Sequence, residues 1–518
     1  MTSEAPDVLT VNAETFPDKP AVIDDRPGEP PRTMTFAELN AYANRLANGM
    51  LDRGVRPGQR VIWCGQNSLE LMAMMHAARK AGLTAVPLNY RLSDDESVYV
   101  VDNSDAVLVW TDAEFAPMFA RIRSDLPQVE EVVVFGGSAL DGQTAEDDLL
   151  GSDSEPAIDA GQAATMIYTS GTTGKPKGAV KSRLGSVEQL GGLLGLIGYT
   201  ADDVYLTCGP LYHSGPGGFA AIAHVLGNTV VLQHRFDPED WLRLLDTYQV
   251  TTTFSAPTPI RMVVNLPPEV KARYSTATMK RMVANAAPWP FALKEAYLRD
   301  FPDDSLFEVY GSTELGVNTV LRPEDQLRKP GSCGLPAPFV DLMLKDDDGN
   351  PISEPHTPGE LWVKASSVLD TYHKAEEKFS QEHDEEGWHT VGDVAYFDDE
   401  GYYYICDRKK DMIISGGMNI YPAEVEAALE EHPEIFEAAV FGIPSEEWGE
   451  SVHAVIVPSG EGLDHEEVTA HARRALASYK IPRSIEFVAE IPKTGSNKIL
   501  KRELRAKFWD GHDNQVGS

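Results

Sequence analysis

Basic residues are scarce in this 518-residue sequence, which holds 45 Lys and Arg against 80 Asp and Glu for a formal net charge of −35. Such an excess of negative charge disfavours nucleic acids and anionic membrane surfaces as partners, because both repel acidic proteins. Long hydrophobic runs are missing too, since the most apolar stretch, LGGLLGLIGY, is too short and glycine-rich to span a bilayer. We therefore expect no nucleic acid and no membrane insertion, and an anionic ligand must enter through a locally basic site.

Cysteine is also rare. The four cysteines lie far apart, without the paired spacing of a disulfide framework or a metal site: Cys64, Cys208, Cys333 and Cys406. The beginning of the chain, MTSEAPDV, has neither a basic segment nor an apolar run of the kind that directs export. We expect reduced thiols and a cytoplasmic location.

The order of the elements predicts an α/β protein of several domains. The chain is too long for one compact core, and its length predicts roughly two to four domains. From Arg60 to Leu88 the pattern is strand, helix, strand, with Leu69, Met72, Ala73 and His76 on one helix face. Residues 331–404 change to short β-rich pieces, and after CDRKKD the pattern predicts a small α+β domain whose first helix opens at Pro422.

The segment Met166–Gly178, MIYTSGTTGKPKG, is rich in glycine and hydroxyl side chains. It is not a Walker loop, because Thr169 stands at the first glycine position and Pro176 follows Lys175, where the metal-binding hydroxyl belongs. Glycine turns that aim N–H groups inward still suit a phosphate. Taken alone, the composition fits a flexible surface turn equally well.

Four further segments accompany this loop in a fixed order: YGSTE at 310–314, GWHTVGD ending at Asp393, DRKKDMIISGGMNIYPAEVE from Asp407, and PKTGSNKILKREL from Pro492. Together the five resemble the adenylate-forming superfamily of acyl-CoA synthetases, adenylation domains and luciferases, over nearly the whole chain. The resemblance implies an α/β fold with a large N-terminal AMP-binding domain, 1–409, of two α/β subdomains and a small β-barrel. A mobile small α+β C-terminal domain, 410–518, would follow.

The resemblance also implies the reaction. A carboxylic acid is first activated with ATP and Mg²⁺ to acyl-AMP, and coenzyme A then takes the acyl group as a thioester. Cations and aligned donors must neutralise the charge when a carboxylate attacks a phosphate. The segment 166–178 then becomes a phosphate loop rather than a surface turn. The implied partner is a small-molecule carboxylic acid, and a homodimer stays open.

The implied nucleotide site combines the phosphate loop, an adenine pocket and a ribose clamp. Glu314 supplies the carboxylate that binds Mg²⁺, and Thr313 donates to the α-phosphate. Tyr310 stacks on adenine, while the Asp393 carboxylate accepts the ribose hydroxyls beside Arg408. The complete set of implied nucleotide-binding residues is Thr169, Ser170, Gly171, Thr172, Thr173, Gly174, Lys177, Asn285, Ala286, Ala287, Pro288, Tyr310, Gly311, Asp393 and Arg408.

Lys498 corresponds to the superfamily's mobile catalytic lysine. Here the sequence departs from the usual pattern, because Asn497 replaces the glycine before the lysine, and Val391 stands where threonine is common. Asn tolerates left-handed backbone better than other non-glycine residues, so the loop can keep its shape. A basic cluster surrounds this lysine and either receives anionic cofactors or forms a solvated helix face: Lys493, Lys498, Lys501, Arg502, Arg505 and Lys507.

The second half-reaction implies a hinge at Lys410. Rotation there would bring the turn of Ser415, Gly416 and Gly417 to the active site, where the absence of side chains lets the pantetheine arm pass.

The acid itself is predicted to be hydrophobic and unaminated. Amino-acid-loading relatives carry an Asp for the substrate amine where this chain has His213, which is both a catalytic and a pocket candidate. The expected pocket is His213, Phe219, Ala286, Gly311 and Val317, and nearby small residues suit a fatty, aryl or polycyclic acid. Other functions stay open: a ligase for a carrier-protein thiol, a partial enzyme that uses ready-made acyl-AMP, a nucleotide-binding regulator, or an oxidative luciferase.

Overall fold

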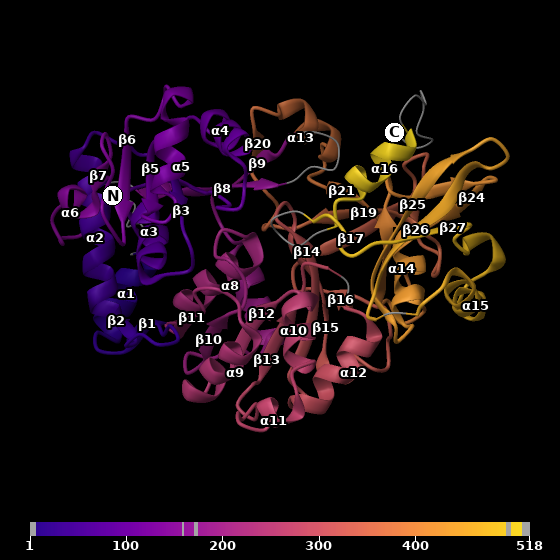
Figure 1. Ribbon diagram of the computed structural model, residues 1–518. Coiled ribbons are helices and arrows are strands. Elements are labelled where there is room, and N and C mark those ends of the chain that lie inside the picture. Colours follow the sequence, from indigo (N-terminus) through magenta and orange to yellow (C-terminus); the bar gives the residue numbers. More distant parts are fainter. Residues whose placement is uncertain are drawn as a thin grey trace.

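The computed structural model describes residues 7–157, 160–169, 175–287, 289–460, 462–493 and 499–509. Two large sheets with their helices form the N-terminal part, and two five-stranded sheets complete the chain (Figure 1). The fold is the predicted α/β arrangement of a large N-terminal domain followed by a small C-terminal one. All four cysteines are free thiols, as expected. Among the described helices, none combines the length and apolarity needed to cross a membrane.

The eight-stranded sheet has the order β20-β9-β8-β4-β3-β5-β6-β7. Its strands are β3 Arg60–Cys64, β4 Thr84–Pro87, β5 Ala106–Asp112, β6 Glu131–Phe135, β7 Thr144–Ala145, β8 Ala164–Thr169, β9 Lys177–Lys181 and β20 Thr371–His373. The strands β3 to β8 pair in parallel, whereas β9 pairs antiparallel with β8 and β20. The Gly-rich segment therefore connects two neighbouring antiparallel strands, β8 and β9.

The nine-stranded sheet has the order β16-β15-β14-β13-β12-β10-β11-β1-β2. Its strands are β1 Pro20–Asp24, β2 Arg32–Thr35, β10 Val204–Thr207, β11 Thr229–Leu232, β12 Thr252–Ser255, β13 Arg281–Ala284, β14 Leu306–Ser312, β15 Gly316–Leu321 and β16 Leu335–Pro336. Its central strands are parallel, and the antiparallel pair β14/β15 carries the YGSTE segment across its turn.

Helices fill the space between the two large sheets and cover their outer faces. The inner layer holds α2 Phe36–Asp52, α3 Leu69–Lys80 and α8 Ser214–Val225, with α1 Val8–Thr15 and α7 Val187–Ile197 beside them. The outer face of the eight-stranded sheet is covered by α4 Asp94–Asn103 and α5 Ala116–Ile122, and α6 Glu146–Leu149 follows β7. The outer face of the nine-stranded sheet is covered by α9 Pro238–Thr247, α10 Pro257–Val264 and α12 Phe291–Asp300, with the short α11 Pro268–Lys271.

Helix α3 shows how the sequence specifies this layer. Ser68 caps its first turn, accepting a hydrogen bond from the backbone N–H of Leu71, and Arg79 and Lys80 occupy its last turn, where the helix dipole favours cations. The predicted inward face is confirmed, since Leu69, Met72, Ala73 and His76 are all buried. His76 lies 2.8 Å from His224 of α8, so it joins two helices of the layer rather than facing solvent.

A five-stranded antiparallel sheet of order β18-β17-β19-β21-β22 forms the small β unit expected after residue 331. Its strands are β17 Asp341–Lys345, β18 Pro351–Ile352, β19 Gly359–Lys364, β21 His389–Phe397 and β22 Tyr403–Arg408, and α13 Glu376–Glu382 lies before β21. The pairing of β21 with β22 places Asp393 directly opposite Arg408.

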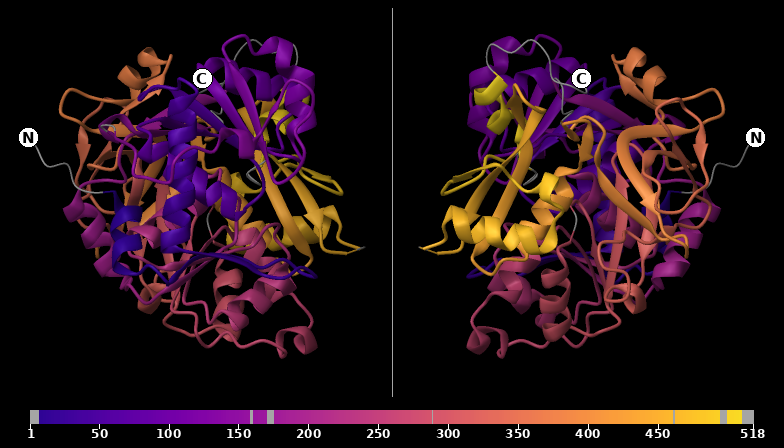
Figure 2. Two further views of the ribbon diagram at one scale, coloured as in Figure 1. Left: turned by 90° about the vertical axis from the view of Figure 1, so that its left-hand side faces the viewer. Right: turned by 90° about the vertical axis from the view of Figure 1, so that its right-hand side faces the viewer.

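The C-terminal unit is a second small sheet flanked by helices, drawn orange to yellow in Figure 1, and Figure 2 shows it from two sides. It contains β23 Ile413–Ser415, β24 Met418–Ile420, β25 Ile435–Ser445, β26 Gly449–Pro458 and β27 Ser484–Phe487. Its helices are α14 Pro422–Glu430, α15 His465–Ala475 and α16 Lys501–Trp509. As predicted, α14 begins at Pro422 and buries Val425 and Leu429.

Candidate active site

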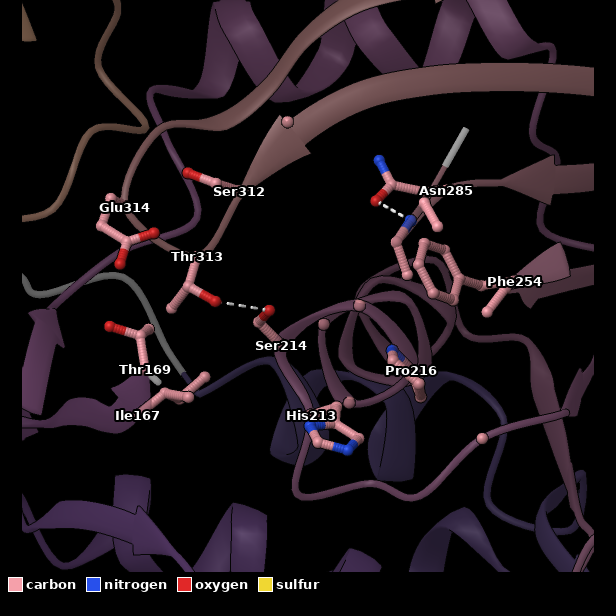
Figure 3. Close-up of a pocket in the computed structure, with 18 of the residues that line it drawn as sticks. Ile167, Thr169, His213, Ser214, Pro216, Phe254, Asn285, Ser312, Thr313 and Glu314 are labelled. Atoms are coloured by element: carbon pink, nitrogen blue, oxygen red, sulfur yellow. Dashed lines mark hydrogen bonds between the residues drawn. The ribbon is translucent and has the colours of Figure 1, made fainter. Parts of the chain in front are cut away.

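A cavity of about 3340 Å³ runs between the large sheets, the small β sheet and the C-terminal unit. The C-terminal end of β14, the start of α8 and the end of β8 meet in it (Figure 3). Most of the residues selected from the sequence line this cavity, although they come from segments as distant as Thr169 and Arg408.

The predicted ribose residues form one connected group. The Tyr310 hydroxyl donates to Asp393 Oδ2 at 2.6 Å, and the Arg408 Nε atom lies 3.4 Å from Asp393 Oδ1. Although burial opposes it, the carboxylate of Asp393 raises the pKa of Arg408. Burial and the same carboxylate raise the pKa of Tyr310 well above its usual value, so its phenol stays a hydrogen-bond donor. A carboxylate held between a donor and a cation suits the hydroxyls of a ribose.

The segment expected to line adenine follows β13. The Asn285 side-chain amide donates to the Val309 carbonyl at 2.6 Å, and its oxygen accepts from the Ala286 backbone N–H. Ala286 has a positive φ of 73°, which aims this short turn into the cavity, and Ala287 is exposed beside it. Pro288 lies outside the described residues. Gly311 belongs to the opposite strand, where a Cβ atom would overlap the Gly316 carbonyl, so only glycine allows the β14/β15 turn to close.

Thr313 and Glu314 lie at that same turn, facing the start of α8 (Figure 3). The hydroxyls of Thr313 and Ser214 are 2.8 Å apart, and the Glu314 carbonyl accepts from the Leu369 backbone N–H at 2.7 Å. The Glu314 side chain points into the space above Thr169 in Figure 3. One carboxylate on the cavity wall fits Mg²⁺, which usually completes its shell with phosphate oxygens and water. No cluster of three or more metal-binding side chains occurs in the part of the chain that the structure describes.

The phosphate loop is described only at its ends. Thr169 ends β8 and Lys177 begins β9, and the two residues are paired across the strands on the cavity wall. Ser170, Gly171, Thr172, Thr173 and Gly174 lie outside the described residues. Burial, and then the neighbouring charge of Lys378, lowers the pKa of Lys177.

The residues expected to form the acid pocket line the cavity around α8. His213 and Phe219 lie on this helix or directly before it, and Val317 faces them from β15. The Phe219 ring stacks on Phe254 with 5.0 Å between centroids. The cavity continues past these residues along α3, where Met72 and Met75 line it. Glycine at position 218 leaves open space beside the helix, and the pocket extends toward the inner helical layer, where His76 and Arg79 line it together with the two methionines.

The C-terminal unit contributes the residues that flank the predicted catalytic lysine. Lys493 and Ile499 line the cavity, while Lys498 and Asn497 between them lie outside the described residues. Lys410 lines the cavity as well, and burial and then the charge of Arg408 lower its pKa to about 8. The turn Ser415–Gly417 is not among the described residues that line the cavity, and Gly416 packs against Trp448 instead.

Sequence reasoning missed several cavity residues. Tyr372 and Glu382 are joined by a 3.1 Å hydrogen bond near Glu314, and Lys378 lies beside them. Lys181 is a further cation on β9. The alternation of Lys177, Ala179 and Lys181 along the strand was the available signal, but only the pairing of β9 shows which face meets the cavity.

Two family models match the sequence: AMP-binding enzyme over residues 9–373, and AMP-binding enzyme C-terminal domain over residues 424–498. The chain belongs to the AMP-binding enzyme family. It is an ATP-dependent, AMP-forming acid–thiol ligase, because several curated relatives that it matches over most of their length are CoA ligases.

Feruloyl-CoA synthase from Amycolatopsis sp is 36% identical over 92% of this chain and 94% of its own length. Long-chain-fatty-acid–CoA ligase from Mycobacterium tuberculosis is 32% identical over 92% of this chain and 93% of its own. Among solved structures, o-succinylbenzoate CoA synthetase from Bacillus subtilis with its acyl-adenylate shares 30% identity and a TM-score of 0.82, covering 99% of both chains. A structure of that enzyme with ATP and magnesium is 29% identical with a TM-score of 0.82, covering 96% of this chain and 99% of that one.

Proposed function

We propose that this protein converts a hydrophobic, unaminated carboxylic acid to acyl-AMP and then to acyl-CoA, and that its C-terminal domain, 410–518, rotates about Lys410 between the two steps. The main support is that Tyr310 and Arg408 both contact Asp393. This group of three residues shares one cavity with Glu314 and with an apolar channel along α8. The nucleotide and acid sites are therefore adjacent, as an attack of a carboxylate on the α-phosphate requires.

Each group has a distinct task in the adenylation step. Asp393 and Arg408 hold the ribose, and the Tyr310 ring stacks on adenine. The Thr313 hydroxyl donates to the α-phosphate, and the segment from Thr169 to Gly174 with Lys177 holds the β- and γ-phosphates. Glu314 would hold Mg²⁺, which when bound neutralises phosphate charge. Lys498 bridges the acid carboxylate and the α-phosphate, stabilising charge as the new bond forms.

The apolar channel supports the choice of acid. His213 stands where an amino-acid-loading enzyme needs a carboxylate, and Phe219, Val317, Met72 and Met75 present no charge to a substrate chain. Relatives act on acids of this kind by name, including feruloyl, indoleacetate and long-chain fatty acyl ligases.

A carrier-protein thiol is the second candidate acceptor, because a fatty acid–[acyl-carrier-protein] ligase from Streptomyces coeruleorubidus is 32% identical over 96% of this chain. The CoA function is favoured since the other curated relatives named above are CoA ligases.

The test is a panel of ferulate, indole-3-acetate, 2-succinylbenzoate, palmitate and alanine with ATP, Mg²⁺ and CoA, analysed by mass spectrometry. We expect acyl-CoA, AMP and pyrophosphate with at least one of the first four acids and none with alanine. Acyl-AMP that accumulates without thioester would favour the carrier-protein function. If none of the acids led to release of pyrophosphate, the proposal would be contradicted. Turnover of supplied acyl-AMP alone would identify a partial enzyme.

A further inference from the structure

Lys181 is a cation on the cavity wall that the mechanism above does not use. It pairs across the strands with Thr165, just as Ala179 pairs with Ile167 and Lys177 with Thr169. Directly paired residues of antiparallel strands project to the same face, and all six of these line the cavity. The register thus directs Lys181 toward the reactants rather than toward the outer solvent.

The surroundings leave this cation without a fixed counter-ion. Two carboxylates face it, Glu314 from the β14/β15 turn and Asp370 from the segment before β20. Asp370 already accepts from the Ser182 backbone N–H at 2.6 Å, and Glu314 is the candidate ligand for Mg²⁺. Within the described ranges, no hydrogen bond or ion pair joins the Lys181 Nζ atom to another residue. Burial lowers the pKa of Lys181 to about 8, and the two carboxylates only partly oppose this effect.

Several other cations of the cavity are paired with carboxylates, in contrast to Lys181. Arg408 lies near Asp393, Lys493 Nζ is 2.9 Å from Glu437, and Lys501 Nζ is 2.8 Å from Glu426. A half-buried lysine without such a partner gains more from a bound anion than a paired one does, because the anion restores interactions that burial removed.

We propose that Lys181 is a substrate-binding residue that pairs with an anionic oxygen of the reactants, and that this oxygen belongs to the carboxylate of the acid. The proposal rests on the proposed function, since it assumes an acid beside ATP. The position on β9 favours the carboxylate over a phosphate. Lys181 is four residues after Lys177, or about 13 Å along the strand. It therefore lies at the end of β9 that is farther from the Gly-rich segment.

The test compares Lys181→Met with Lys181→Arg and with Lys280→Met, a matched control on an exposed lysine outside the cavity. Acid KM is measured with the best acid of the panel, and affinities for ferulate and ATP are measured by calorimetry without turnover. We expect Lys181→Met to raise acid KM and the ferulate Kd about tenfold or more, the loss typical of a hydrogen bond to a charged group. Lys181→Arg should recover much of this loss, and the ATP Kd should stay within twofold.

The outcomes separate the two sources of the anion. A raised Kd for ATP with an unchanged ferulate Kd would overturn the carboxylate assignment and place a phosphate at Lys181. Unchanged affinities for both would overturn the binding role entirely. If the wild-type protein formed acyl-CoA from none of the acids, that result would count against the proposed function. The calorimetric comparison would still decide the role of Lys181. Lys181→Gln serves in the same comparison if the methionine variant does not fold.

Discussion

At the scale of single residues, Tyr310 and Asp393 bring together two nucleotide-binding roles that the sequence suggested separately. Tyr310 was expected as a stacking ring and Asp393 as a hydroxyl acceptor, and the structure joins them by a 2.6 Å hydrogen bond. The phenol thus orients the carboxylate while its ring remains on the cavity wall.

Asp393→Ala should weaken binding of both ATP and AMP, because both carry the ribose that this carboxylate accepts. Loss of a charged acceptor costs on the order of 1.5 to 3 kcal/mol, or roughly 10- to 100-fold in affinity. Calorimetry with AMP provides the measurement, and Asp399→Ala is the control, since Asp399 is 84% exposed on a turn of the same small sheet. An AMP affinity equal to that of the control would show that the ribose binds elsewhere.

Lys498→Ala should slow acyl-AMP formation by about 10² or more, the scale of one electrostatic group at a transition state. Thioester formation from supplied acyl-AMP should change little, because the proposed rotation carries this lysine away. Pyrophosphate release and CoA consumption are assayed separately, with Lys507→Ala as control on the neighbouring helix α16. Equal losses in both half-reactions would contradict the assignment, and a higher adenylation rate in Asn497→Gly would show that Asn497 restrains the loop.

A candidate site residue could be predicted from the sequence only where a short local motif contains it. Asp393 and Arg408 were found because each sits in a short motif, and their opposition across β21 and β22 agrees with one ribose site. Lys181 and Glu382 were missed because strand pairing and chain reversal bring them to the cavity. The alternation along β9 groups Lys181 with Lys177, but only the strand pairing shows which face meets the cavity. The inward face of α3 was predictable from its period alone.

At the scale of elements, α6 is attached to α2 by a buried contact. The Tyr42 hydroxyl of α2 donates to Glu146 at the start of α6. Burial raises the pKa of Glu146 to about 7, since the charged form loses water and gains no cation. The junction is therefore most stable with the carboxyl protonated.

Glu146→Gln should stabilise the protein increasingly as the pH rises from 4.5 to about 7, and by a constant amount above that range. A carboxyl whose folded-state pKa is raised contributes stability that is complete below its unfolded value and is lost as pH rises through the folded value. The loss falls between pH 4.5 and about 7 here, and the neutral amide avoids it. Denaturant unfolding at pH 5 and pH 8 should show a difference between variant and wild type that grows with pH, to roughly 1 to 2 kcal/mol after solvent screening. Glu385→Gln, on an exposed turn, is the control, and a constant difference would refute the buried-charge explanation.

At the scale of the whole molecule, Arg261 makes a polar contact between the N-terminal and C-terminal parts. Arg261 of α10 donates to the Phe436 carbonyl at 2.8 Å, and its guanidinium lies 3.5 Å from Glu430. Polar contacts of this kind separate at little cost, because water replaces them. Lys410 is the second residue after β22, and the backbone N–H groups of Asp411 and Met412 both donate to the Arg408 carbonyl.

Lys410→Pro should arrest the proposed rotation, since proline fixes φ at the residue that must turn. Adenylation should continue in the observed arrangement, whereas thioester formation from supplied acyl-AMP should fall by at least tenfold. Lys410→Ala is the control, because it removes the same side chain and leaves the backbone free. Wild-type thioester formation in the proline variant would remove Lys410 as the pivot.

The position of the ribose clamp beside this pivot has a consequence for a reactive intermediate. Acyl-AMP is a mixed anhydride, which water destroys if it escapes. In the proposed rotation Asp393 and Arg408 would stay in place, and Arg408, only two residues before Lys410, would lie close to the axis, where a rotation moves atoms least. The AMP part of the acyl-AMP can stay bound to these two residues while the residues around its acyl group change. The enzyme would then retain its acyl-AMP by binding the nucleotide close to the rotation axis, and not by covering the site with a lid.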